Sequence, residues 1–227
     1  MPQYNSFNPS YGKKTNRNLK KKQLVKFLLL IGCILAFVAG YLLLNTKGTQ
    51  SGEVTIPVAK TIPSPAQKPI IQTKLLKPNP YSRPQTPLTK INGVVIHYVG
   101  NPGTTAESNR NYFNSLSKTK TTYASSHFII DLTGTIIQCI PLNEISYASN
   151  ERNEDTISIE VCHPDKTGKF TNESYKSLVS LTKWLCSTYN LNINDVIRHY
   201  DVTGKQCPLY FVTHEDAWLS FKNEVFT

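Results

Sequence analysis

A histidine and a cysteine stand close together near the end of this 227-residue chain, in the segment RHYDVTGKQCP at residues 198–208. His199 and Cys207 are too far apart to meet on one helix, where neighbouring side chains are three or four positions apart. We therefore expect His199 at the end of a strand and Cys207 in the loop after it. An imidazole and a thiolate are both ligands for transition metals, so the pair predicts a metal site that needs a third ligand from elsewhere.

The best candidate for the third ligand is His97, in the run Gly93-Val94-Val95-Ile96-His97-Tyr98-Val99-Gly100. This run is typical of a buried strand and places an imidazole near the C-terminal end of that strand. Two histidines and one cysteine form a zinc set of the catalytic type, which leaves the fourth tetrahedral position for water. The sequence therefore predicts a Zn²⁺ site made by His97, His199 and Cys207.

Four motifs follow one another along the chain: VVIHYVGNPG, SSHFIID, SIEVC and RHYDVTGKQCP. Together they resemble the zinc-dependent N-acetylmuramoyl-L-alanine amidases of type 2, a family that includes amidase-type phage lysozymes and peptidoglycan recognition proteins. The resemblance covers residues 75–227. It implies an α/β fold with a central mixed β-sheet flanked by helices. It also implies hydrolysis of the amide bond between N-acetylmuramic acid and L-alanine in bacterial peptidoglycan.

The same resemblance suggests two catalytic residues. Lys205 stands where the family has its catalytic lysine, and a cation beside the metal can stabilise a developing oxyanion; the alternative is a solvated loop lysine. Glu160 matches the glutamate of the "IEIC" strand in bacterial members and is the candidate general base. Strict alternation along the strand turns Glu160 away from its apolar neighbours, toward a cleft. An exposed glutamate on an edge strand is the other interpretation.

Substrate contacts are expected from the turn after the first ligand and from one further histidine. Tyr98 and Asn101 follow the first ligand and could line the groove. His127 lies near the metal by resemblance, although a structural role fits it equally well. Ser126 precedes it where part of the family has a tyrosine, so a tyrosine role cannot be transferred. The family often has His-Ala-Gly where this chain has Ala148-Ser149-Asn150, so one groove residue is missing.

A binding protein without catalytic activity is the alternative to an enzyme. Peptidoglycan-binding modules on the same fold usually lack the cysteine ligand, which is present here as Cys207. A purely structural zinc domain would need a fourth protein ligand, and no soft ligand stands at a suitable spacing. Fold alone does not separate these classes, but the intact set of three ligands and Lys205 favours the hydrolase.

The formal net charge of +10 would suggest nucleic-acid binding, but the basic residues are unevenly distributed. Residues 1–88 contain 13 Lys and Arg and a single acid, Glu53. Residues 89–227 contain 12 Lys and Arg and 14 acids. The part of the chain that carries the motifs is therefore slightly acidic, and we expect no nucleic-acid partner.

The N-terminal part is predicted to anchor the protein in the cell membrane. Residues 1–22 contain six Lys and Arg and no acid, which predicts a basic cytoplasmic segment. Residues 23–44 are predicted to be a single transmembrane helix, because eighteen uncharged residues run from Phe27 to Leu44. The catalytic domain would then face the cell wall. A cleaved signal peptide is the alternative, but the apolar run continues past Ala39-Gly40, the only small-residue candidate.

A proline-rich linker is expected between this anchor and the domain. Eight prolines lie between Asn45 and Thr89, which favours an extended and semi-rigid chain. We assign residues 45–74 to the linker and residues 75–227 to the catalytic domain. Within the domain, a Cys139–Cys162 disulfide would suit an exported protein, but three buried thiols, including Cys186, are the favoured interpretation.

Alternation and helical periodicity predict four strands and three helices in the domain. The strands are expected at 93–99, 125–131, 135–140 and 156–162, with a hairpin turn at Leu132-Thr133-Gly134, and the helices at 105–116, 173–189 and 213–223. Asn172 is the expected N-cap of the helix at 173–189. The apolar stripe of that helix should cover one face of the sheet and leave the other face for a cleft.

Overall fold

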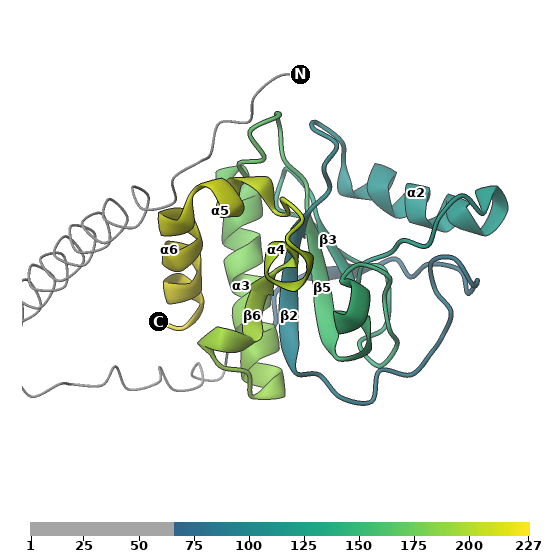
Figure 1. Cartoon of the computed structure of the whole chain (residues 1–227), viewed down its shortest axis with the longest axis horizontal. Helices are drawn as coiled ribbons and strands as arrows, with labels where there is room; N and C mark the ends of the chain where they lie inside the picture. Colours follow the sequence, from purple (N-terminus) through teal and green to yellow (C-terminus); the bar gives the residue numbers. More distant parts are fainter. Residues whose placement is uncertain (1–65) are drawn as a thin grey trace, which may run out of the picture. The chain divides into compact units, whose positions relative to one another are not determined.

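The computed structural model describes residues 66–227, in which helices flank a central sheet (Figure 1). The strands are β1 (Ile71–Thr73), β2 (Gly93–Tyr98), β3 (Phe128–Ile130), β4 (Ile136–Gln138), β5 (Thr156–Val161) and β6 (Val196–Arg198). The helices are α2 (Ala106–Thr119), α3 (Asn172–Tyr189), α4 (His199–Thr203), α5 (Leu209–Thr213) and α6 (Glu215–Val225), with short 3₁₀ helices η1 (Asn150–Glu154) and η2 (Ile193–Asp195). The expected α/β class is confirmed.

The six strands are hydrogen-bonded in the order β1-β4-β3-β5-β2-β6. All neighbouring pairs are parallel except β3 and β4, which form the predicted antiparallel hairpin. Gly134 in this hairpin has a φ of +82°, and its N–H donates to the carbonyl of Asp131 at 2.9 Å. Glycine reaches this conformation without a Cβ clash, which explains its place in the turn. The sheet is therefore mixed, as expected.

An apolar core fills the space between one face of the sheet and helices α3 and α6. Ile96 of β2 and Ile159 of β5 belong to the same buried cluster as Leu178 and Leu185 of α3. The expected N-cap of α3 needs correction by one residue. Asn172 is the first helical residue, and the cap is Thr171, whose Oγ1 accepts the N–H of Ser174 at 3.0 Å.

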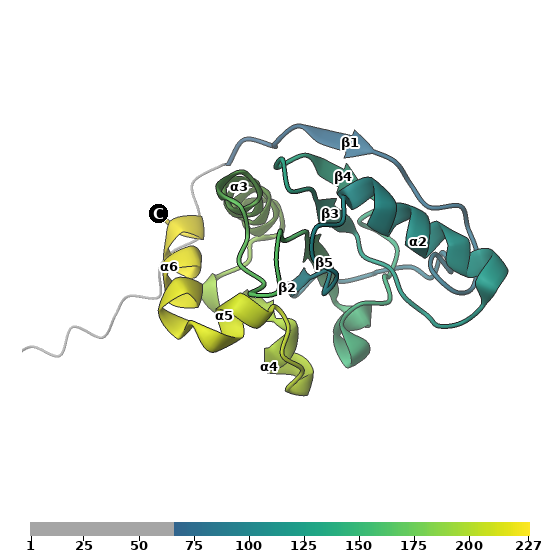
Figure 2. The ribbon, with the colours of Figure 1, turned by 90° about the horizontal axis from the view of Figure 1, so that it is seen from above.

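The opposite face of the sheet is shared between a helix and a cleft. Helix α2 contributes Phe113 and Leu116 to a second buried cluster, which includes Ile129 of β3 and Ile137 of β4. Figure 2 shows the strands lying between α3 and α2. The expectation that this whole face is left for a cleft is therefore corrected. Residues of β2 and β5 line the cleft, and Phe113 of α2 also contributes to its lining.

Several short elements differ from the sequence expectation. Strand β1 lies within residues 45–74, the expected linker, and pairs in parallel with β4, so the sheet begins before residue 75. Strand β6 and helix α4 follow one another directly. The helix expected at 213–223 is α6, shifted by two residues, and the short helix α5 before it was not predicted. Elements of three to five residues are too short to give a periodic pattern, which is why the sequence did not reveal them.

Three predictions concern N-terminal segments that lie outside the described residues. They are the basic segment 1–22, the membrane anchor 23–44 and residues 45–65 of the linker. Between residues 66 and 227, no helix combines the length and apolar character needed to cross a membrane.

Within residues 66–227, the three cysteines away from the candidate ligands are buried. Cys139, Cys162 and Cys186 are free thiols in the structure, as the favoured interpretation expects. Burial raises the pKa of each thiol to about 12. All three therefore remain protonated at neutral pH and act as small apolar side chains in the core.

Candidate metal centre

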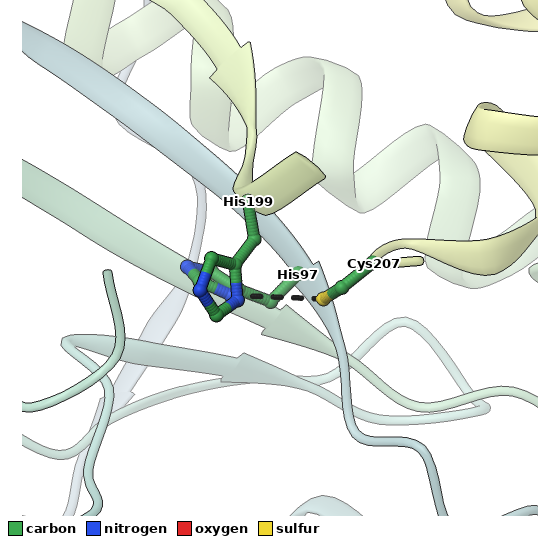
Figure 3. Close-up of side chains that lie close together, drawn as sticks. All are labelled: His97, His199 and Cys207. Atoms are coloured by element: carbon green, nitrogen blue, oxygen red, sulfur yellow. Dashed lines mark hydrogen bonds between the residues drawn. The ribbon is translucent and has the colours of Figure 1, made fainter. Parts of the chain in front are cut away.

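Three side chains from separate parts of the sequence converge at one edge of the sheet (Figure 3). His97 lies near the C-terminal end of β2, His199 begins α4 directly after β6, and Cys207 lies in the next loop. Because β2 and β6 are parallel neighbours, their C-terminal ends reach the same edge. The three buried residues each offer one ligand atom, and these atoms lie within 4.8 Å of one another. The structure brings together the set predicted from the sequence.

Backbone hydrogen bonds and an ion pair hold the turn between His199 and Cys207 in place. The N–H of Tyr200 donates to the carbonyl of Cys207 at 2.9 Å, and Gly204 ends α4 with a φ of +76°. The carboxylate of Asp201 accepts the backbone N–H of Arg198 at 2.8 Å and pairs with its guanidinium at 2.9 Å. Asp201 therefore stabilises the turn, which is the role that the sequence favoured over metal binding.

Each candidate histidine has one ring nitrogen held by a polar side chain and one nitrogen left for another partner. Nε2 of His97 lies 3.1 Å from Oγ of Ser149, and its Nδ1 lies 3.8 Å from Sγ of Cys207. Nε2 of His199 lies 3.0 Å from Oδ1 of Asn150, while its Nδ1 is buried with no hydrogen-bond partner. A buried nitrogen without a partner is costly unless something binds it. These nitrogen and sulfur donors fit a Zn²⁺ ion with three protein ligands.

Burial keeps these groups in their uncharged forms. Desolvation, together with His199 and Lys205, holds the pKa of His97 well below its usual value. Desolvation and Lys205 likewise lower the pKa of His199. Neutral imidazole is the form that binds metals. Burial, with Glu160 nearby, raises the pKa of the Cys207 thiol to about 12, so metal binding here must displace a proton from sulfur.

The candidate ligands face a cavity of about 620 Å³. Besides these ligands, the lining includes Tyr98, Glu160 and Lys205, together with several aromatic and amide side chains. The aromatic and amide side chains are Phe113, Tyr123, Tyr147, Asn150 and Asn153. A volume of this size accommodates a small organic group, and most of the side chains that line it carry polar atoms.

Glu160 lies beside the first ligand on the cleft face of the sheet. In the register of β2 and β5, Glu160 is the direct neighbour of His97. Its Oε2 is buried and has no hydrogen-bond partner. Burial raises the pKa of Glu160 to about 8, although the positive charge of Lys205 opposes this shift. A carboxyl group with such a pKa can both accept and deliver a proton near neutral pH.

Lys205 is exposed to solvent and at the same time lines the cavity. Its positive charge lowers the pKa values of His97, His199 and Glu160, so the charge lies close to all three groups. A lysine pointing elsewhere from this loop would not produce that pattern.

Residues 87–209 match a family model described as N-acetylmuramoyl-L-alanine amidase. The chain belongs to this family. Curated relatives include N-acetylmuramoyl-L-alanine amidase CwlL of Bacillus licheniformis, which is 32% identical over 163 residues, covering 66% of this chain and 45% of that protein. Amidase BlyA of Bacillus subtilis strain 168 is 32% identical over 168 residues, covering 65% and 44%. The chain thus spans about half the length of the curated relatives it matches.

Solved structures support the same assignment. The chain in the structure of PlyL is 26% identical, with a TM-score of 0.59; the match covers 69% of this chain and 96% of that chain. The catalytic domain of XlyA is 25% identical, with a TM-score of 0.58 over 69% of this chain and 99% of that domain. The described residues therefore contain the whole amidase fold of these neighbours.

The three residues expected to contact substrate lie in different surroundings. Tyr98 lines the cavity and stacks on His163, with ring centroids 4.9 Å apart. Asn101 is exposed in the turn after β2 and does not line the cavity. His127 is fully buried away from the lining, and both of its ring nitrogens have protein partners. The structural role that the sequence left open for His127 is the one that its surroundings support.

Sequence reasoning missed the side chains that contact the two candidate histidine ligands. Ser149 and Asn150 stand in the turn where the family often has His-Ala-Gly, and the sequence suggested only that a groove residue was missing. Two polar residues in that turn were a usable signal. Their partners, however, lie 52 and 49 positions away in the chain, which no local pattern reveals.

Proposed function

We propose that this chain hydrolyses the amide bond between N-acetylmuramic acid and L-alanine in bacterial peptidoglycan, in a Zn²⁺-dependent reaction. The observation that carries the proposal is the convergence of His97, His199 and Cys207 on a cavity that also contains Glu160 and Lys205. A bound Zn²⁺ would polarise the scissile carbonyl and acidify the attacking water. The chain itself must then orient the substrate, move protons and stabilise the developing charge.

Glu160 is the proposed general base and acid. It takes a proton from the attacking water, whose oxygen bonds to the carbonyl carbon of the lactyl group. As the carbon–nitrogen bond breaks, the same carboxyl group delivers that proton to the nitrogen of L-alanine. The burial of Glu160 and its unpaired Oε2 support this role, because no internal hydrogen bond competes for the proton.

Lys205 is the proposed stabiliser of the oxyanion that forms on the attacked carbonyl. Its ammonium group lines the cavity from the loop that also carries Cys207. A fixed positive charge next to developing negative charge lowers the barrier without a change in ligand number. Lys205→Ala should therefore reduce turnover while the zinc content stays unchanged. Tyr98, which follows His97 and lines the cavity, is the proposed substrate contact.

Release of new amino termini tests the proposal. The purified full chain, loaded with zinc, is incubated with cell-wall peptidoglycan, and free L-alanine amino termini are measured. We expect them to accumulate, to stop accumulating after treatment with a chelator and to return with added Zn²⁺. A zinc-loaded protein that binds peptidoglycan but releases no L-alanine termini would instead be the non-catalytic binding module.

We also propose that the protein is held in the cell membrane by residues 23–44, with its N-terminus in the cytoplasm and its catalytic domain facing the wall. The basic flank and the uncharged run from Phe27 to Leu44 support this topology. Protease added to intact protoplasts should remove the domain and leave the N-terminus protected. A mature protein that begins near Gly40 would show a cleaved signal peptide instead.

A further inference from the structure

We infer that Ser149 and Asn150 are positioning residues that hold His97 and His199 in the orientation needed to bind the metal. This inference rests on the proposed zinc-dependent function and adds two residues that no ligand motif contains. Ser149 is the residue before η1 and Asn150 is its first residue. One short segment, distant in sequence from both ligands, therefore contacts both imidazole rings.

The contacts determine which ring nitrogen is free. Oγ of Ser149 lies 3.1 Å from Nε2 of His97, and Oδ1 of Asn150 lies 3.0 Å from Nε2 of His199. Each ring has only two nitrogens, so engaging Nε2 leaves Nδ1 for the metal. These Nδ1 atoms are the ones that point toward Cys207 or lack a partner. Both rings are thus held by the nitrogen opposite to the proposed ligand atom.

The chemistry of the Asn150 oxygen also selects the tautomer of His199. The amide oxygen of Asn150 can only accept a hydrogen bond, so Nε2 of His199 must carry the proton and Nδ1 must carry the lone pair. The hydroxyl of Ser149 can accept in the same way from Nε2 of His97. A lone pair on Nδ1 is what a metal ligand requires, and hydrogen bonding at the other nitrogen also makes the ligand more basic.

The segment itself is firmly attached to the fold. Oδ1 of Asn153 accepts the N–H groups of Ala148 and Ser149 at 2.9 and 2.7 Å. Arg152 pairs with Asp155 at 2.7 Å, next to the start of β5. Two side chains fixed in this way restrain the histidine rings before any metal arrives, so less ordering remains to be done on binding.

Metal affinity provides the test, measured on the full chain by competition with a chromogenic chelator. Ser149→Ala removes the hydroxyl from a buried position. Asn150→Gly removes the amide but suits the backbone, because Asn150 is exposed and has a φ of +54°. We expect each variant to bind Zn²⁺ roughly 10- to 100-fold more weakly than the wild type, the usual loss when an outer-shell partner is removed.

The chain offers a matched control for each variant. Ser146 is buried to the same degree as Ser149, but its hydroxyl bonds to Ser158 at 2.7 Å and not to a ligand. Asn190 is exposed with a φ of +58° at the end of α3. Ser146→Ala and Asn190→Gly should bind zinc like the wild type. Asn150→Asp keeps an acceptor and should retain at least wild-type affinity.

A spectroscopic measurement separates orientation from general destabilisation. In the metal-free protein, ¹⁵N NMR of the imidazole rings should show His199 with its proton on Nε2. In Asn150→Gly the same ring should show a mixture of the two tautomers, while Asn190→Gly keeps the wild-type spectrum. This difference does not depend on turnover.

Clear outcomes overturn the inference. If the wild type binds zinc and both Ser149→Ala and Asn150→Gly bind it equally well, these residues do not position the ligands, although the proposed function stands. An equal loss of affinity in the two control variants would show a general effect on stability. If the wild type itself binds no zinc, the proposed function fails first.

Discussion

Of the four buried histidines in the described residues, three form two groups, His127 alone and His97 with His199, which differ in how their ring nitrogens are used. His127 accepts the N–H of Ser158 at Nδ1 and faces the carbonyl of Glu144 with Nε2, at 3.0 and 2.9 Å. His97 and His199 each have only Nε2 held by a side-chain oxygen. Burial lowers the pKa of all three rings, so burial alone does not distinguish them.

The number of ring nitrogens that have protein partners therefore indicates the role of a buried histidine. When protein atoms satisfy both nitrogens, the ring is a structural link, here between β5 and the segment after β4. When one nitrogen remains and converges with other soft donors, the ring can bind a metal. The following predictions test this distinction, beginning with the largest expected effect.

Cys207→Ser should have the largest effect, on metal binding. A neutral hydroxyl is a poor substitute for a thiolate, so zinc affinity should fall by more than the roughly 10- to 100-fold expected for an outer-shell residue. His127→Gln should leave the zinc affinity unchanged. Metal analysis and chelator competition measure both. Wild-type affinity in Cys207→Ser would remove Cys207 from the ligand set, and a large loss in His127→Gln would erase the distinction between the two groups.

Glu160→Gln should have the next largest effect, on turnover. The amide keeps the size of the side chain but removes the proposed base, so turnover should fall roughly 100- to 10,000-fold. Zinc content should stay at one ion per chain, because Glu160 is not a proposed ligand. The measurement is release of L-alanine amino termini at fixed zinc loading. Unchanged turnover would mean that another group acts as the base.

His127 should make stability depend on pH. Burial lowers its pKa from 6.5 to about 4. Above pH 6.5 the folded and unfolded states both carry a neutral ring, so pH has no effect through this residue. Between pH 6.5 and 4 the unfolded state binds a proton that the folded state does not, so the free energy of unfolding falls as the pH falls. The total loss is about 3 kcal/mol.

The comparison with His127→Gln isolates this contribution. Urea unfolding of the metal-free wild type and of the variant is measured from pH 7 to pH 4. The glutamine cannot titrate, so the variant should lose less stability over that interval even if it is less stable at pH 7. Parallel curves for the two proteins would show that His127 titrates normally in the folded state.

Ser146→Ala should have the smallest effect and sharpen the comparison. Its hydroxyl bonds to Ser158, which in turn contacts His127, so the change weakens the structural network and not the metal site. Loss of one such hydrogen bond should lower the free energy of unfolding by about 1 kcal/mol. Thermal or urea unfolding measures this change. A drop in zinc affinity without a loss of stability would contradict the separation of the two groups.

Local patterns were enough to predict the central elements of the fold. Alternation along β5 placed Ile157, Ile159 and Val161 on one face and Glu160 on the other, because side chains in a strand point to opposite faces in turn. Helical periodicity predicted α3 to within one residue of its start. The turn at Gly134 followed from its position between two apolar runs. These features depend on residues close together in the chain.

The candidate ligands were also predictable, because their chemistry is unusual. Histidine and cysteine in ordered motifs pointed to His97, His199 and Cys207 before any distance was known. The same reasoning could not decide between two roles for His127, because its role depends on hydrogen bonds with Ser158 and Glu144, which are distant in the sequence. Nor did it find β1, which is held in the sheet by one neighbour, β4.

The sequence by itself determined the types of ligand, their order and the face of the strand that carries Glu160, because residue chemistry and alternation are local properties. Only the tertiary structure decided that Ser149 and Asn150 meet the two histidines, and that His127 meets protein atoms on both sides. Parallel strands bring distant segments to one edge of a sheet, and the hydrogen bonds formed there depend on that arrangement. The nitrogen that each histidine leaves free is therefore a property of the fold.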